Sequence, residues 1–221
     1  MPRIIILLLL SFFSLSVNSQ LLNLAVNDSL TNVELDSLKS TFGFGKTVPE
    51  EYALSFYTAL SYYPELDSSV ITLKKVRIKT TLNARPTNTS LIFRKRTKRK
   101  YVIRINSRNQ DSLILLDNVP FNARIGLFGH ELTHFIDYHH KSFGGVLKRM
   151  FSYSTLKGKE KYEKEIDSMT VSIGLGQQLY TWSYYVLYKS KGSKKYKAYK
   201  KLVYLEPEEI LKLIEEHETS N

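Results

Sequence analysis

Residues Phe128-Gly-His-Glu-Leu-Thr-His-Phe135 (FGHELTHF) contain two histidines four positions apart and no proline. On an α-helix this spacing projects both imidazole rings from one face, one turn apart. Asn122 is the expected N-cap of that helix, which is predicted to reach about Tyr138 and to end before Gly144-Gly145. The stretch therefore predicts a helix that presents two imidazoles to a single point.

The segments before this helix favour β-strands. Val70–Leu82 (VITLKKVRIKTTL) is rich in Val, Ile and Thr and alternates in polarity, as a half-buried strand does. Ser90–Phe93 and Tyr101–Ile105 flank a run of basic residues, and together they are predicted to form a hairpin. Leu113–Leu116 is expected to add a further short strand. The middle of the chain thus predicts a small sheet.

Helical patterns lie on both sides of this sheet region. Helices are expected at Ser29–Ser40, Glu50–Tyr63, Lys159–Tyr188 and Pro207–Glu216. The order helices, sheet, helices predicts an α+β domain in which a small mixed sheet packs against the helix that carries the two histidines. A length of 221 residues suits a single domain.

His130 and His134 are suited to bind one zinc ion, because imidazole nitrogens are common zinc ligands. Glu131 is rotated by about 100° from His130 on the helix, so its carboxylate is expected beside the metal position. From there it can accept a proton from a metal-activated water and deliver it to a leaving amine. The H-E-x-x-H spacing therefore predicts a zinc-dependent hydrolase.

A catalytic zinc site needs a third protein ligand, and two residues compete for that role. Glu163 lies on the next expected helix, where Asp167 shares its face and could hold a ligand imidazole through its second nitrogen. His140 follows His134 at the distance found in metzincins, but Asp137 stands where those enzymes carry the glycine that lets the chain turn. Glu163 is the preferred third ligand, and His140 is the alternative.

The segment from Phe128 to Asp167 resembles the gluzincin type of zinc peptidase, which binds zinc with the two histidines of HExxH and a glutamate from a later E-x-x-x-D helix. The resemblance implies a zincin-like fold, a protein or peptide substrate and one bound Zn²⁺. The site it implies comprises the ligands His130, His134 and Glu163, the general base Glu131 and the supporting carboxylate Asp167. Ile166 departs from the pattern, since several such families carry alanine there.

Two further features follow from the resemblance. In such peptidases the strand before the active-site helix forms the sheet edge along which the substrate lies, and Tyr101–Ile105 would be that strand. A side chain that stabilises the oxyanion is also expected, and Tyr162, Tyr180 and Tyr184 are candidates by residue type only.

Residues 1–19 have the layout of a secretory signal peptide. Arg3 precedes an apolar run from Ile4 to Val17, which is short for a membrane span. Residues 20–221 would then form the mature domain, exported to the periplasm or the extracellular space, with an uncleaved anchor as the alternative. The chain contains no cysteine, which excludes a lipoprotein anchor and disulfides.

The chain is strongly basic, with a formal net charge of +11. Its basic residues cluster in Arg94–Lys100 and Lys189–Lys201, which suit contacts with polyanions or anionic surfaces. No nucleic-acid-binding motif accompanies the clusters. The alternative function is therefore a basic exported binding protein for polyanions, whose metal site is structural or vestigial. The sequence indicates no particular oligomeric state.

Overall fold

The computed structural model describes residues 28–108 and 114–219. Within them the strands form one mixed sheet in the order β1-β2-β4-β3. The strands are β1 (Lys46–Thr47), β2 (Val70–Val76), β3 (Leu82–Pro86) and β4 (Lys100–Asn106). β2 runs parallel to β1 and β4, whereas β3 lies antiparallel to β4 at one edge. The expected α+β class with a small mixed sheet is confirmed.

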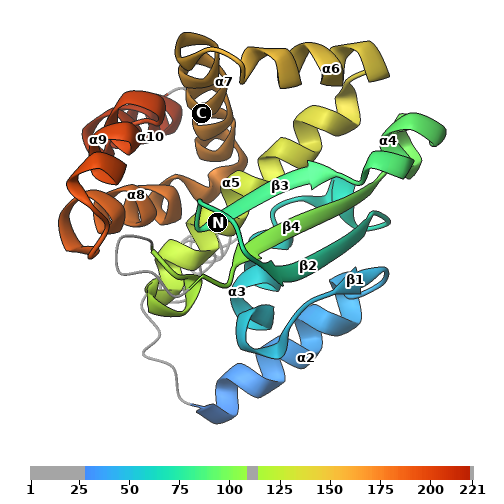
Figure 1. Cartoon of the computed structure of the whole chain (residues 1–221). Coiled ribbons are helices and arrows are strands. Elements are labelled where there is room, and N and C mark those ends of the chain that lie inside the picture. Colours follow the sequence, from blue (N-terminus) through green and yellow to red (C-terminus); the bar gives the residue numbers. More distant parts are fainter. Residues whose placement is uncertain (1–27, 109–113, 220–221) are drawn as a thin grey trace, which may run out of the picture.

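Helices account for most of the rest of the described chain. They are α2 (Asp28–Phe42), α3 (Glu50–Leu60), α4 (Asn88–Phe93), α5 (Phe121–His140), α6 (Phe143–Ser152), α7 (Leu156–Thr170), α8 (Gly176–Tyr184), α9 (Lys194–Val203) and α10 (Pro207–Thr219). Figure 1 shows α5 between the sheet and the C-terminal helices, and it packs against β3, α3 and α8. The HExxH stretch therefore lies in the helix that joins the two layers.

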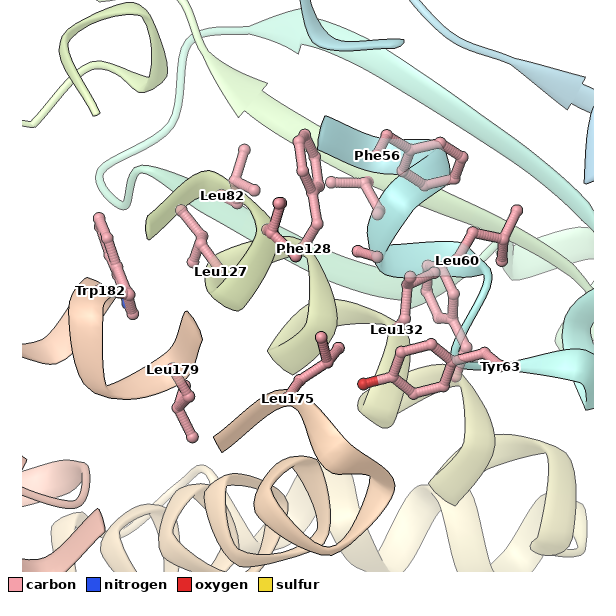
Figure 2. Packing of buried hydrophobic residues seen from close by; sticks show 14 of the residues in the cluster. Phe56, Leu60, Tyr63, Leu82, Leu127, Phe128, Leu132, Leu175, Leu179 and Trp182 are labelled. Carbon is pink, nitrogen blue, oxygen red and sulfur yellow. The ribbon is translucent and has the colours of Figure 1, made fainter. Parts of the chain in front are cut away.

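The core is built around α5. Phe128 meets Phe56 of α3 edge to face, with ring centroids 5.6 Å apart. On the sheet side, Phe135 stacks on Tyr101 of β4 at 4.4 Å. Figure 2 shows Phe128 and Leu132 of α5 packed among core side chains from two sides. Phe56 and Leu60 come from α3, whereas Leu175 and Leu179 come from the segment between α7 and α8 and from α8. Each such side chain contributes about 1.5–3 kcal/mol when buried, so α5 is held from several directions.

The predicted hairpin around the basic run is wrong. Ser90–Phe93 lies in the short helix α4, and β4 pairs with β3 as its antiparallel partner. The strand-like run Val70–Leu82 ends as a strand at Val76, and Leu82 already begins β3. Residues 77–81 form no strand although the alternation continues through Thr80, and the chain reverses there, so one predicted strand contributes to two.

The edge strand also differs from the prediction. Tyr101–Ile105 lies inside the sheet, because β4 is paired on one side with β2 and on the other with β3. The edge strand next to α5 is β3, which is paired on one side only. It follows β2 in the chain but is separated from β2 in the sheet by β4. Sequence order alone does not predict this arrangement.

Several helix boundaries shift as well. The N-cap of α5 is Pro120 rather than Asn122, and the helix ends at His140, before Gly144-Gly145. The two glycines lie in the first turn of α6, whose N-cap Ser142 accepts a hydrogen bond from the N–H of Gly145. Lys141 has an extended backbone, so the break between α5 and α6 comes there.

The long helix predicted from Lys159 to Tyr188 is interrupted. Gly174 has a φ of 106°, which divides the run into α7 and α8. That backbone conformation is costly for any residue with a Cβ, so the glycine provides the bend. The helices predicted at Ser29–Ser40 and Pro207–Glu216 are present as α2 and α10.

Two predictions concern segments that the structure covers incompletely. Residues 1–19, predicted to be a signal peptide, lie outside the described residues. Of the strand predicted at Leu113–Leu116, Leu113 also lies outside them, while Leu116 begins a 3₁₀ turn that ends at Asn118. Between residues 28 and 219, leaving aside 109–113, no helix combines the length and the apolar character that crossing a bilayer requires.

Candidate metal centre

The two histidines of α5 lie side by side in the interior. Their ring centroids are 4.9 Å apart, and both side chains are buried. The Nε2 atoms of His130 and His134 lie 3.1 Å and 3.5 Å from the same oxygen, Oε2 of Glu163 on α7. One nitrogen from each ring and one carboxylate oxygen thus converge on a single point.

Glu163 Oε2 is a buried oxygen at the centre of this cluster. Within the described residues it makes no hydrogen bond of suitable geometry, although two imidazole nitrogens face it. The other oxygen, Oε1, accepts a hydrogen bond from the hydroxyl of Tyr153 at 2.7 Å, which fixes the carboxylate orientation. Potential ligand atoms of His130, His134 and Glu163 all lie within 4.8 Å of one another. These residues can hold a metal ion, which would satisfy the unpaired oxygen.

The outer nitrogens of both histidines are held by other side chains. His130 Nδ1 lies 2.7 Å from Asp167 Oδ1, and the second carboxylate oxygen of Asp167 accepts the N–H of Leu205 at 3.0 Å. His134 Nδ1 lies 3.2 Å from the hydroxyl of Tyr162. With a metal bound, such partners would keep each Nδ1 protonated and leave each Nε2 lone pair for the shared point.

The carboxylate of Asp137 supports His134 indirectly, through the hydroxyl of Tyr162. The hydroxyl of Tyr162 donates to Asp137 Oδ2 at 3.1 Å, so His134, Tyr162 and Asp137 form a continuous hydrogen-bonded chain. Asp137 is buried, and its charge is balanced by Lys141 at 2.7 Å and Arg149 at 3.1 Å. Asp137, which stands where metzincins carry glycine, therefore links α5 to Tyr162 and to two basic side chains.

Charges within the cluster shift its titration. Burial alone lowers the pKa of His130, but Asp167 and then Glu163 outweigh this effect and raise that pKa to about 10. Burial alone raises the pKa of Glu163, yet the imidazoles of His130 and His134 close to its Oε2 hold that pKa well below its usual range. Burial raises the pKa of Glu131, against the opposing charges of His134 and His130.

Hydroxyl contacts set the register of α7 against α5. Thr133 Oγ1 lies 2.8 Å from Thr170 Oγ1, and both groups are buried. Tyr63 places its hydroxyl 2.9 Å from Thr133 and donates to the carbonyl of Gly129 at 2.7 Å. Because Thr170 lies two turns beyond Glu163 on α7, this network fixes the height at which Glu163 meets the histidines.

Glycines on α5 allow the segment after α7 to approach closely. A Cβ added to Gly126 would lie 2.1 Å from the backbone oxygen of Gln178 on α8. One added to Gly129 would lie 2.5 Å from a methyl carbon of Leu175. The glycine that precedes the first histidine is therefore needed for packing, independently of any chemistry.

The cluster opens onto a cavity of about 380 Å³. His130, Glu131, His134 and Glu163 line it together with residues 82–85 of β3. Tyr138, Tyr153, Tyr199 and Tyr204 contribute further lining. The cavity places a buried ligand cluster, an adjacent carboxylate and a strand edge around one space.

The free side of β3 offers unpaired backbone groups to this space. The N–H of Asn106 bonds to the carbonyl of Thr81, and the N–H of Thr87 bonds to the carbonyl of Lys100. The backbone N–H and C=O groups of the odd-numbered residues of β3 therefore point towards β4. Those of Leu82 and Ala84 alternate with them and point to the open side. Both residues line the cavity.

His140, the alternative third ligand, lies elsewhere. Its side chain is 58% exposed, and its Nε2 lies 2.9 Å from a carboxylate oxygen of Glu65. Because α5 continues as a helix to His140, six residues carry this side chain about 9 Å along the axis from His134. A sharp turn after His134 would be needed to bring it back.

The tyrosines suggested for oxyanion stabilisation are not placed alike. Tyr162 is the partner of His134 Nδ1, whereas Tyr180 and Tyr184 on α8 stack on one another at 6.0 Å and do not line the cavity. Tyr204, which sequence reasoning missed, has its ring 5.6 Å from that of His130. It lies after α9, and no motif in the sequence marks it.

Comparisons with known proteins add no relative to this description. No family model matches the chain, and no curated protein and no solved structure is significantly similar to it. The functional assignment of the centre formed by His130, His134 and Glu163 therefore starts from its own geometry.

Proposed function

We propose that this chain is a zinc-dependent peptidase of the gluzincin type with a zincin-like fold. The observation that carries the proposal is the shared cavity, onto which both the buried ligand cluster and the unpaired edge of β3 open. A ligand cluster alone would suit a structural metal. A strand edge beside it offers a place for an extended peptide.

The donor set suits one Zn²⁺. Two imidazole nitrogens and one carboxylate oxygen are a ligand combination found in catalytic zinc sites, which leave a fourth position open. Asp167 and Tyr162 hold the outer nitrogens of His130 and His134, as supporting groups do in such sites. Zinc bound there would supply Lewis-acid polarisation of the substrate carbonyl and a lowered pKa for the attacking water.

Glu131 is the proposed general base. It is buried, follows His130 on α5 and lines the same cavity as the ligand cluster. Its carboxylate accepts a proton as the water attacks the peptide carbonyl, and it delivers that proton to the leaving amine. Tyr153 and Asp167 take no proton in this scheme, because each orients a ligand.

The peptide main chain is placed by β3. Leu82 and Ala84 direct N–H and C=O groups to the open side, so an extended substrate can pair with them as an added strand. Such pairing is independent of side chains, and it would place the main chain of the substrate across the face of the ligand cluster. The substrate strand thus lies beside β3, whereas β4, the strand first expected to play this role, is covered.

A metal and activity assay on the wild type and three variants tests the proposal. We expect purified wild-type protein to bind one equivalent of zinc and to cleave an unfolded protein substrate. Glu131→Gln should retain zinc and lose roughly a hundredfold or more in rate, whereas His134→Ala should lose both. Glu160→Gln, which changes a carboxylate on the outer part of α7, is the matched control and should behave as wild type.

Two outcomes would contradict the assignment. An active Glu131→Gln would rule out the proposed base. Zinc-loaded wild type that cleaves nothing, yet binds heparin-like polymers in a salt-sensitive manner, would favour the basic binding protein instead. Export belongs to the proposal too, and N-terminal sequencing of the secreted product should give a chain that begins near residue 20.

A further inference from the structure

The outer face of the β3 edge carries positive charge. In the β3–β4 register Ala84 pairs with Ile103, which is in the core, and Ala84 packs against that core. By alternation, Asn83 and Arg85 point to the opposite face, together with Arg104 of β4. Arg85 on the edge strand and Arg104 on its neighbour therefore lie on the same side of the sheet, and both line the cavity.

Neither arginine has a carboxylate partner in the part of the chain that the structure describes. Arg85 is exposed and Arg104 is half-buried, and both line the cavity with the ligand cluster. Arg104 donates through Nε to Asn83 Oδ1 at 2.7 Å, which holds its side chain over β3. Within the described residues neither arginine forms an ion pair, and burial followed by the like charge of Arg85 lowers the pKa of Arg104.

A third cation borders the same space. Lys159 of α7 lines the cavity, with its ammonium 5.4 Å from the ring centroid of Tyr153 and 5.7 Å from that of Tyr199. The carboxylates that line the cavity are Glu131 and Glu163, and both belong to the proposed catalytic centre. The rim beyond the catalytic centre is therefore basic.

We propose that the cleft selects extended peptides with acidic side chains, which Arg85 and Arg104 bind across the edge of β3. This inference rests on the proposed peptidase function. A peptide added to β3 turns alternate side chains to the outer face, where its residues lie directly or diagonally opposite Arg85. A glutamate or aspartate there pairs with Arg85, which forms no ion pair with any described residue, whereas a lysine meets two like charges.

The backbone edge distinguishes this substrate from other polyanions. Leu82 and Ala84 offer strand-type hydrogen bonds, which a peptide main chain matches and a nucleic acid or sulfated glycan does not. A polyanion that bound only through charge would depend on the basic clusters Arg94–Lys100 and Lys189–Lys201 as well. The two modes therefore differ in which arginines they need.

The test uses one peptide sequence with a single position, on the outward-facing side, changed among Glu, Gln and Lys. Binding is measured by fluorescence anisotropy to the zinc-loaded Glu131→Gln protein, and kcat/KM is measured with the active protein. We expect about a tenfold preference for the Glu peptide over the Gln peptide, with the Lys peptide weakest. Arg85→Gln and Arg104→Gln should each remove most of this preference in both assays.

Arg94→Gln is the matched control, because Arg94 is exposed, belongs to a basic cluster and does not line the cavity. It should leave the preference unchanged, and Arg85→Glu should reverse it in favour of the Lys peptide. Arg85→Gln and Arg85→Glu should keep the melting temperature of the parent, since Arg85 is exposed. An equal loss of the Glu preference in Arg94→Gln and Arg85→Gln would contradict a specific role for Arg85.

The outcomes separate this inference from the peptidase proposal. Equal cleavage of all three peptides by the active protein would overturn the acidic preference and leave the peptidase assignment standing. If Arg85→Gln abolishes binding of the Glu peptide and the wild type cleaves no peptide, the acidic preference would be supported and the peptidase assignment overturned. Equal binding of all three peptides to every variant would overturn the role of both arginines.

Discussion

Helices α5 and α7 both contribute to the candidate centre, but they do so in different ways. α5 is buried over most of its length and supplies two ligands through a spacing that one helix fixes by itself. α7 is rich in lysine and glutamate and buries a single stripe that includes Glu163, Asp167 and Thr170. The position of His130 relative to His134 is fixed within one helix. The position of Glu163 relative to both depends on how α7 packs against α5.

The registration of α7 comes from contacts away from the ligands. Thr133 and Thr170 meet across the two helices, and Tyr63 of the segment after α3 joins them. Gly126 and Gly129 let the chain after α7 approach α5 closely. A change at these positions should disturb α7 first and leave the α5 pair in place.

The largest effect is expected when the α7 ligand is removed. Glu163→Ala should weaken zinc binding by about a hundredfold to a thousandfold, because zinc sites gain about 10–16 kcal/mol from roughly four ligands. Competition with a chelator measures this change. His140→Ala is the control and should leave the affinity unchanged, because His140 pairs with Glu65 at the surface. The reverse result would make His140 the third ligand.

A smaller effect is expected from closing the gap between α5 and α8. Gly126→Ala should lower the free energy of unfolding by about 2–3 kcal/mol, because the new methyl group would meet the backbone of Gln178, which cannot rotate away. Gly144→Ala is the control, since a Cβ there meets nothing within 4 Å. It should stabilise the protein by up to about 1 kcal/mol through helix propensity. Urea unfolding of both proteins measures the contrast, and equal stabilities would contradict the close packing.

A still smaller effect is expected from the support of His130. Asp167→Asn should weaken zinc binding by about tenfold, the low end of the range for such supporting groups. The single amide oxygen cannot serve both His130 Nδ1 and the N–H of Leu205 as the carboxylate does. Asp137→Asn should have a weaker effect, because Tyr162 stands between Asp137 and His134. Equal losses in the two variants would show that distance from the ligand does not matter.

The contrast between α5 and α7 also explains what could be predicted. The i,i+4 pair of His130 and His134 and the E-x-x-x-D pair on α7 were visible because helical periodicity is a short-range property. The place of β3 in the sheet could not be predicted in this way. It pairs with β4 and not with β2, the strand before it in the chain, and such an order depends on long-range contacts. Arg85 was passed over because the strand containing it was not predicted, so no alternation could place it on an edge.

Other errors have local causes that a single sequence does not resolve. Ser90–Phe93 has the composition of a strand, but Thr87 and Asn88 before it start a helix, and its apolar Ile92 and Phe93 remain exposed. Gly174 looked compatible with a continuous helix, because glycine is tolerated there at a modest cost. Only its positive φ shows that α7 and α8 are separate segments.

The open side of β3 has a consequence for how this basic protein behaves at high concentration. A strand edge that accepts a substrate can also accept the same strand from a second molecule, which is how sheets extend into aggregates. Arg85 at that edge would bring like charges together in such a pair, and Pro86 beside it lacks the N–H that would continue the ladder. The arginine proposed to attract acidic chains would thus also protect the molecule from joining its own copies.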